Sequence, residues 1–278
     1  MKTKWFTLGL CLLLVVFAAC NKDDENGSGN GGSQQTEGSL SGLFSIGNGK
    51  QVRFSQGNLQ YQASTDTWRF AAKQYECIGN ANSNIGLFYQ GWVDLFGWGT
   101  SGYNDIKPWL TDYDMEAASI TGTKYDWGLN NAISNGGNQA GLWHLLTIDQ
   151  WDYLVNGRSG SRYAKATVAD VRGLILLPDH WSDTTFVLNA VNEAEAEFES
   201  NLINTTDWAN KLEANGVVFL PCAGLREGTT VNYVNGFGRY WSSTYIEKAR
   251  SLFFRQGDVR PEGADYRSGF SVRLVRDL

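Results

Sequence analysis

The chain has few residues of the kinds that build common catalytic and metal sites. Among its 278 residues there are two histidines, His144 and His180, and cysteine and histidine form no cluster with the spacing of metal ligands. The sequence therefore offers few candidate ligands for a zinc site and few candidate histidines for a catalytic triad. The sequence predicts no metal and no cofactor.

Long hydrophobic runs are lacking as well. The main apolar run, residues 8–17, follows Lys2 and Lys4 and is too short to span a bilayer, but it has the length of a signal-peptide core. It ends in Phe17-Ala18-Ala19-Cys20, which resembles the lipobox of bacterial lipoproteins. We therefore expect residues 1–19 to be a signal peptide and Cys20 to be the lipid attachment site.

Residues 20–38 have the composition of a flexible linker. They are rich in Gly, Ser, Asn and Gln, and such a stretch buries too little apolar surface to order itself. The charged residues 22–25 (KDDE) resemble the surface-export signal of Bacteroidetes lipoproteins, although a solvated linker also explains them. The resemblance implies a protein that is lipid-anchored in the outer membrane and exposed at the cell surface.

Cysteine and positive charge are scarce too. Of four cysteines, Cys11 leaves with the signal peptide and Cys20 is acylated, so Cys77 and Cys222 either pair or stay as two thiols. The net charge of −6 becomes −8 when Lys2 and Lys4 are removed with residues 1–19. This charge argues against nucleic acid as a partner.

Aromatic residues and 32 glycines, against 4 prolines, predict an α+β domain with short strands, a few helices and long ordered loops. Two-residue periodicity predicts strands at 52–54, 58–61 and 68–70, with a turn at Gln56-Gly57, and a buried strand at 217–220. A capping box of Thr147 with Gln150 predicts a helix that ends at Asn156-Gly157. Further helices are expected over 190–200 and from about 206 to 215.

Several short motifs resemble the Fibrobacter-type major paralogous domain, which is abundant in Bacteroidetes lipoproteins. They are residues 54–61 (FSQGNLQY), 94–102 (DLFGWGTSG), 144–147 (HLLT), 151–154 (WDYL), 173–178 (GLILLP), 219–221 (FLP), 240–244 (YWSST) and 269–276 (GFSVRLVR). Together these motifs cover nearly all of residues 44–278. We therefore expect residues 39–278 to form a single domain.

The order of these motifs is similar to the formylglycine-generating-enzyme-like branch of the C-type lectin fold. That resemblance implies a mixed domain whose terminal strands meet. The enzymes of this branch hold copper with a reactive cysteine pair near the C-terminal end, but this chain has no cysteine after Cys222. The calcium loop of the lectin branch also has no counterpart, because the nearby proline reads Arg260-Pro261-Glu262. A fold without its catalytic site supports binding at most.

The segment after Trp241 is the predicted binding surface. Strand alternation predicts that Leu252 and Phe254 face inward while Ser251, Phe253 and Arg255 face outward. Residues 239–278 carry eight Lys/Arg and five Asp/Glu, a balance of +3, whereas residues 39–238 come to −8. This difference favours an anionic partner, unless the loop is merely solvated. The predicted ligand-binding residues are Tyr245, Lys248, Arg250, Phe253, Arg255, Arg260, Tyr266 and Arg267.

The same segment resembles the variable region of diversity-generating retroelement proteins, which display a mutagenised C-terminal segment on a lectin-type fold. The resemblance implies a fixed framework between variable positions. That framework would be Trp241, Leu252, Phe254, Val259, Pro261 and Gly269-Phe270. An ordinary, non-diversified member of the paralogous family is the alternative.

The sequence thus favours a non-enzymatic lipoprotein that binds an unknown protein or glycan. Two other classes stay open: a structural envelope or pilus-tip subunit, and a carbohydrate-active hydrolase with paired acids. The acids that flank Trp92, Trp98, Trp109 and Tyr113 are Asp94, Asp105, Asp112, Asp114 and Glu116. Acids in Gly/Asn-rich loops are more often turn and capping residues.

Overall fold

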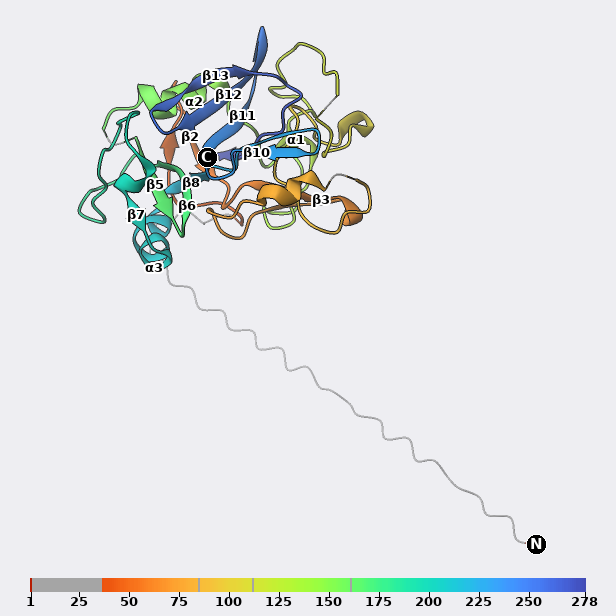
Figure 1. The fold of residues 1–278 in the computed structure, drawn as a ribbon, viewed down its shortest axis with the longest axis horizontal. Coiled ribbons are helices and arrows are strands. Elements are labelled where there is room, and N and C mark those ends of the chain that lie inside the picture. The colour runs from red at the N-terminus through yellow and green to blue at the C-terminus, as the bar shows by residue number, and fades with distance from the viewer. Residues whose placement is uncertain (2–36, 85, 112, 161) are drawn as a thin grey trace, which may run out of the picture. The chain divides into compact units, whose positions relative to one another are not determined.

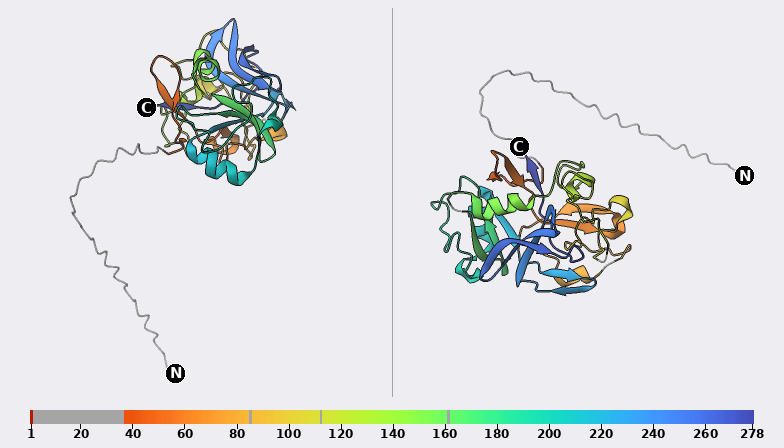
Figure 2. Two further views of the ribbon diagram at one scale, coloured as in Figure 1. Left: turned by 90° about the vertical axis from the view of Figure 1, so that its left-hand side faces the viewer. Right: turned by 90° about the horizontal axis from the view of Figure 1, so that it is seen from above.

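The computed structural model describes residues 1, 37–84, 86–111, 113–160 and 162–278. Cys20 and most of the predicted signal peptide and linker lie outside these residues. The chain divides into two units, Met1–Gln34 and Gln35–Leu278. The second unit is a mixed α+β structure in which the described strands form small sheets and the helices are few and short, so the predicted fold class is confirmed at this level (Figures 1 and 2).

The largest sheet has four strands in the order β7-β5-β6-β8. These are β5 (Tyr163–Val168), β6 (Val171–Leu176), β7 (Leu202–Ile203) and β8 (Val218–Pro221). The prediction of a buried strand closed by Pro221 is confirmed, since every residue of β8 is buried. Beside the sheet, the ring of Trp208 packs edge-on against Phe219 at 5.5 Å.

A second, three-stranded antiparallel sheet is built from β11, β12 and β13. Its strands span Phe237–Ile246, Lys248–Arg255 and Asp258–Ala264. Tyr240 pairs with Leu252, and Gly238 pairs with Phe254. A Cβ at Gly238 would lie 2.0 Å from Cζ of Phe254, so only glycine fits beneath this ring.

The two ends of the second unit meet in one sheet, as the resemblance implied. β2 (Gln51–Phe54) pairs with β1 (Phe44–Ser45) on one side and with β14 (Val275–Asp277) on the other. The register puts Val275 opposite Phe54. Chain segments more than 200 residues apart therefore lie side by side.

The other strands form two-stranded ribbons. They are β3 (Leu59–Gln62) with β4 (Thr67–Phe70), and β9 (Leu225–Glu227) with β10 (Thr230–Asn232). The strands predicted near 52–54, 58–61 and 68–70 are present. However, β2 and β3 do not pair across Gln56-Gly57, because each finds a partner elsewhere.

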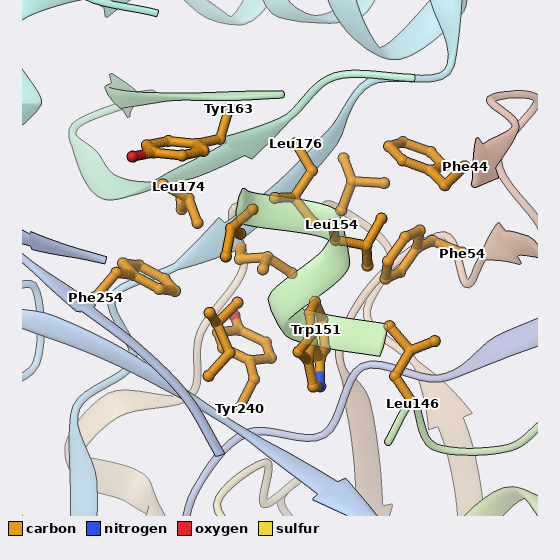
Figure 3. Packing of buried hydrophobic residues seen from close by; sticks show 14 of the residues in the cluster. Phe44, Phe54, Leu146, Trp151, Leu154, Tyr163, Leu174, Leu176, Tyr240 and Phe254 are labelled. Carbon is orange, nitrogen blue, oxygen red and sulfur yellow. The ribbon is translucent and has the colours of Figure 1, made fainter. Parts of the chain in front are cut away.

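The helix predicted from Thr147 is confirmed. Its capping box is complete, with α2 at Ile148–Asp152 and a π-helical extension over Tyr153–Gly157. Trp151 is fully buried, and its ring lies between those of Phe54 at 5.9 Å and Tyr240 at 6.4 Å. Figure 3 shows these side chains around the helix, which joins the sheets into one core.

The helix predicted over 206–215 is also present. It begins as α3 (Thr205–Asp207), continues through Trp208–Leu212 and Glu213–Asn215, and ends at Gly216, whose φ is 77°. The short helix α1 spans Trp127–Asn130. Among the described residues, no helix combines the length and apolarity that a membrane span requires.

The prediction of a helix over 190–200 is wrong. Only Phe198–Ser200 form a helical turn there. Ala190 and Asn192 have φ angles of 51° and 64°, which a right-handed helix excludes. The Asn192 side chain instead accepts a hydrogen bond from the backbone N–H of Arg162 at 2.8 Å. A contact with a distant segment therefore determines the conformation here, and the local helix propensity does not.

A second core lies under the far half of the β11–β12–β13 sheet. Trp241 is fully buried, its ring lies 4.4 Å from that of Phe270, and its Nε1 donates to the carbonyl of Phe96 at 2.7 Å. Ala249 of β12 and Ala264 of β13 are buried in the same cluster, so both strands pack against it. The predicted framework residues Leu252, Phe254 and Val259 are likewise buried, whereas Pro261 is half-buried.

Trp241→Ala should lower the free energy of unfolding by about 3–5 kcal/mol, because it leaves a cavity and orphans a buried carbonyl. The matched control is Phe88→Ala, since Phe88 is 85% exposed. This control should change stability by less than about 0.5 kcal/mol. Urea unfolding of both variants measures the two effects, and equal losses would place Trp241 outside the core.

Candidate functional site

A cavity of about 190 Å³ opens at one end of the β11–β12–β13 sheet. We call it the tyrosine pocket. Its lining is formed by the β11–β12 turn, the end of β13 and the following loop: Tyr245, Glu247, Lys248, Ala264, Asp265, Tyr266 and Arg267. Four of the eight predicted ligand-binding residues therefore lie together: Tyr245, Lys248, Tyr266 and Arg267.

A bulge in β11 places Tyr245 at this pocket. Residues 242–244 of β11 stand opposite a single residue of β12, Arg250. Such a bulge bends and twists the strand. Trp98 fixes the bulge, since its Nε1 donates to the Ser242 carbonyl at 2.8 Å. The Trp98 ring also lies 5.8 Å from that of Tyr245, so this wall of the pocket is held from inside.

Both tyrosines of the pocket are half-buried and tied to neighbouring loops. The Tyr266 hydroxyl donates to the Asp114 carboxylate at 2.8 Å, and the backbone N–H of Tyr245 donates to the Ser119 hydroxyl at 2.9 Å. The bond to Asp114 raises the pKa of Tyr266, so its phenol stays protonated at neutral pH. The pocket thus has preorganised aromatic walls.

The four charged residues that line the pocket balance, two of each sign. Glu247 and Asp265 oppose Lys248 and Arg267, and the Arg267 guanidinium donates to both carboxylate oxygens of Asp265 at 3.2 Å. Hydrogen bonds from Arg267 lower the pKa of Asp265. The positive balance of residues 239–278 is therefore not located at the pocket.

Phe253, Arg255 and Arg260 form a separate group on the outer face of the same sheet. The prediction that Phe253 is exposed is wrong, since the residue is only 7% exposed. Alternation does turn Phe253 away from Leu252. However, the guanidiniums of Arg239, Arg255 and Arg260 lie 4.9, 5.8 and 5.3 Å from its ring and cover it. Truncating Phe253 therefore removes buried surface.

One more prediction for β12 needs correction, and one predicted residue lies apart from the others. Ser251 was expected to face solvent but is fully buried, because it shares a face with Trp241, which the second core covers. Arg250 lies in neither group of binding residues. It is half-buried, and a Cβ at Gly263 would lie 3.3 Å from its Nη1, so its guanidinium covers the neighbouring strand β13.

Cys77 and Cys222 are both free thiols. Cys222 is buried and Cys77 half-buried. Burial raises the pKa of Cys77 to about 11, and it raises the pKa of Cys222 well above its usual value. Both groups are therefore protonated at neutral pH, whereas the thiolate is the reactive form.

Two of the acids considered for a hydrolase are already engaged within the domain. Asp94 is fully buried and accepts hydrogen bonds from the Ile78 backbone and the Asn82 side chain at 2.9 and 2.7 Å. Asp114 binds the Tyr266 hydroxyl. Asp112 lies outside the described residues. Among the described residues, no group of three or more acids, cysteines or histidines is arranged to hold a metal ion.

A second cavity, of about 260 Å³, lies beside α2. Its charged residues already satisfy each other, since Arg158 donates to Asp179 at 3.3 Å and Asp179 also accepts from the backbone N–H and the hydroxyl of Ser45. We assign this cluster a structural role, because every strong donor and acceptor in it has a partner.

No family model, no curated protein and no solved structure matches this chain.

Sequence reasoning missed four residues of these surfaces: Glu247, Ala264 and Asp265 at the pocket and Arg239 beside Phe253. Arg239 alternates with Gly238 and Tyr240, so strand periodicity alone places it on the outer face. Glu247 and Asp265 become pocket residues only because the β11–β12 turn approaches the loop after β13. Nothing local in the sequence signals that approach.

Asp94 should titrate at a higher pH than an ordinary carboxyl group, because burial raises its pKa to about 6. Burial also raises the pKa of Asp126 to about 6. The folded protein then binds these protons more tightly than the unfolded chain. Their contribution to the free energy of unfolding should therefore fall as pH rises from about 4 to about 6. Carbon-13 NMR of the carboxyl groups measures the titration.

Asp265 is the internal control, because the Arg267 hydrogen bonds lower its pKa. Its signal should titrate at a lower pH than that of an ordinary aspartate carboxyl group. An Asp94 signal that moved together with that of Asp265 would contradict the burial of Asp94.

Proposed function

We propose that this chain is a surface-exposed bacterial lipoprotein whose domain, residues 39–278, binds a ligand at the tyrosine pocket without catalysing a reaction. One observation carries the proposal. Four residues selected from the sequence as ligand contacts line a single cavity, and buried aromatic rings support the strands that present them. Rigid support beneath accessible side chains is what a recognition site requires.

The C-type-lectin-like fold is part of this proposal. Pairing of β2 with β14 brings the terminal strands together, and the long C-terminal hairpins stand on a buried framework. Both features fit the formylglycine-generating-enzyme-like branch. In the diversity-generating retroelement interpretation, the pocket residues on this framework would be the positions that vary.

The pocket chemistry suits a ligand that offers an apolar face and hydrogen-bonding groups. The two tyrosine rings provide stacking surface, and the balanced charges favour no net charge in the ligand. A sugar ring and a polar or aromatic protein side chain both have these properties. The ligand is therefore a glycan or a protein at the surface of another cell, virus or host.

Membrane anchoring predicts a clear fractionation result. Wild-type protein should partition into detergent with the membrane, and Cys20→Ala should be released or accumulate as an unprocessed precursor. Detergent phase separation followed by immunoblotting measures both. Cys222→Ser is the matched control and should stay in the membrane fraction, because Cys222 is a buried free thiol of the domain.

Protease treatment of intact cells tests whether the anchored domain is exposed at the cell surface. The domain should be cleaved from the cells, while a periplasmic marker protein stays intact. A domain that resists protease on intact cells but is cleaved after lysis would contradict surface exposure.

Tyr245→Ala/Tyr266→Ala should weaken ligand binding about tenfold or more, because these two rings form the pocket walls. The probes are a glycan microarray and intact bacterial and host cells measured by flow cytometry. The control is Tyr75→Ala, which removes a half-buried tyrosine packed against the cluster of Trp208 and Phe219 beside the four-stranded sheet. It should bind as wild type does.

Thermal melts of both variants separate binding from folding. If wild-type binding persists when both pocket tyrosines are absent and the protein is folded, the site lies elsewhere. The aromatic loops around Trp92–Trp109 would then be the next candidate.

A further inference from the structure

The outer face of the β11–β12–β13 sheet carries a surface that the pocket does not include. The sheet register places three residues on this face at one level, Arg239, Phe253 and Arg260, and Phe237 and Arg255 at the next level. We call these five residues the arginine face.

Aromatic rings extend this face towards solvent. The rings of Phe253 and Phe237 lie 5.6 Å apart, and the ring of Tyr233 lies 5.1 Å from that of Phe237. Exposure increases along the row, from 7% for Phe253 to 65% for Tyr233. The outer end of the row therefore offers apolar surface to a partner.

Guanidiniums surround the buried end of the row. Arg239 lies between two rings, 4.9 Å from Phe253 and 5.0 Å from Phe270, and its Nε has no hydrogen-bond partner among the described residues. Burial, and to a smaller extent the charge of Arg260, lowers the pKa of Arg239 to about 10, so the group stays charged at neutral pH. Packed rings hold these cations in fixed positions.

The arginine face already binds carboxylates of its own chain. Glu262 accepts hydrogen bonds from both Arg239 and Arg260, and Asp258 forms an ion pair with Arg260. Arg255 is exposed and forms no ion pair with any residue that the structure describes. The face thus has one more cation than it has acids to pair with.

Neighbouring groups limit the extent of this positive surface. At the β12–β13 turn, the Gln256 side chain donates to the Glu197 carboxylate at 3.1 Å, so negative charge lies at that border. Arg273, which also contributes to the +3 balance of residues 239–278, is fully buried and bonds to Gln74. The unpaired positive charge of this face therefore lies at Arg255, whereas Arg260 on the same face is exposed but already pairs with Asp258 and Glu262.

We propose that the arginine face, together with Tyr233, binds an acidic peptide segment of a partner protein. One carboxylate of the segment pairs with Arg255, and a second contacts the exposed side of Arg260, which stays paired with Asp258 and Glu262. The apolar side chains of the segment pack on Tyr233 and Phe237. Arginine suits this role because its planar fork matches a carboxylate. The proposal does not depend on the tyrosine pocket, which has balanced charge and lies at the other end of the sheet.

A peptide fits this surface better than an anionic polysaccharide does. The face alternates guanidiniums with phenyl rings that have no hydrogen-bonding group. A short peptide presents carboxylates and apolar side chains in the same alternation, whereas a polyuronate presents carboxylates and hydroxyls. Unmatched hydroxyls over Phe237 would lose hydration without gaining a partner.

The experiment is fluorescence anisotropy of a labelled peptide that alternates glutamate with tyrosine, titrated with the full chain in detergent. Arg255→Gln/Arg260→Gln should weaken binding of this peptide about tenfold or more. Added salt should weaken wild-type binding as well, because the contacts are partly exposed ion pairs. A peptide that alternates lysine with tyrosine should not bind.

The matched control is Lys50→Gln/Arg172→Gln, which removes the same charge from exposed or half-exposed positions outside this face. It should keep the wild-type affinity. An equal loss in both double variants would show that only net charge matters and would overturn the proposal. Polygalacturonate that binds as tightly as the acidic peptide, and loses affinity in the same variant, would overturn the choice of a peptide.

Discussion

The rest of the structure depends on the backbone hydrogen bonds of residues 269–275. This segment passes between the two main cores and forms hydrogen bonds with five separate segments, through the backbone groups of Phe96, Arg226, Arg239, Leu59 and His144. Each contact joins parts of the chain that are distant in sequence. The side chain of Phe270 meanwhile supports Trp241. The surfaces for which we propose a binding role lie on the β11–β12–β13 sheet, which this segment holds in place from the inside.

That sheet separates two kinds of surface. Its inner face packs Tyr240, Leu252 and Phe254 into the first core, and half of its outer face packs Trp241 into the second. What remains is the tyrosine pocket at one end and the arginine face at the other. The pocket is small and its lining charges balance, whereas the arginine face has one more cation than acids, so the two suit different ligands.

Local signals predicted elements well where neighbouring residues alone determine the structure. The capping box at Thr147 is such a case, since both of its hydrogen bonds form within four residues. The expected helix over 190–200 failed because Asn192 is held by Arg162, a residue 30 positions away. The outward position of Phe253 was derived correctly from alternation, but alternation does not reveal that arginines cover the ring.

The sequence by itself determined that the domain is α+β and that Trp241, Phe254 and Phe270 belong to its buried framework. Strand periodicity and aromatic content depend on local chemistry, so they can be recognised in the sequence alone. Only the tertiary structure decided that Tyr245, Lys248, Tyr266 and Arg267 share a pocket while Arg255 and Arg260 lie apart from it. A bulge, a turn and the register of three strands set those distances, and they depend on contacts between residues far apart in the chain.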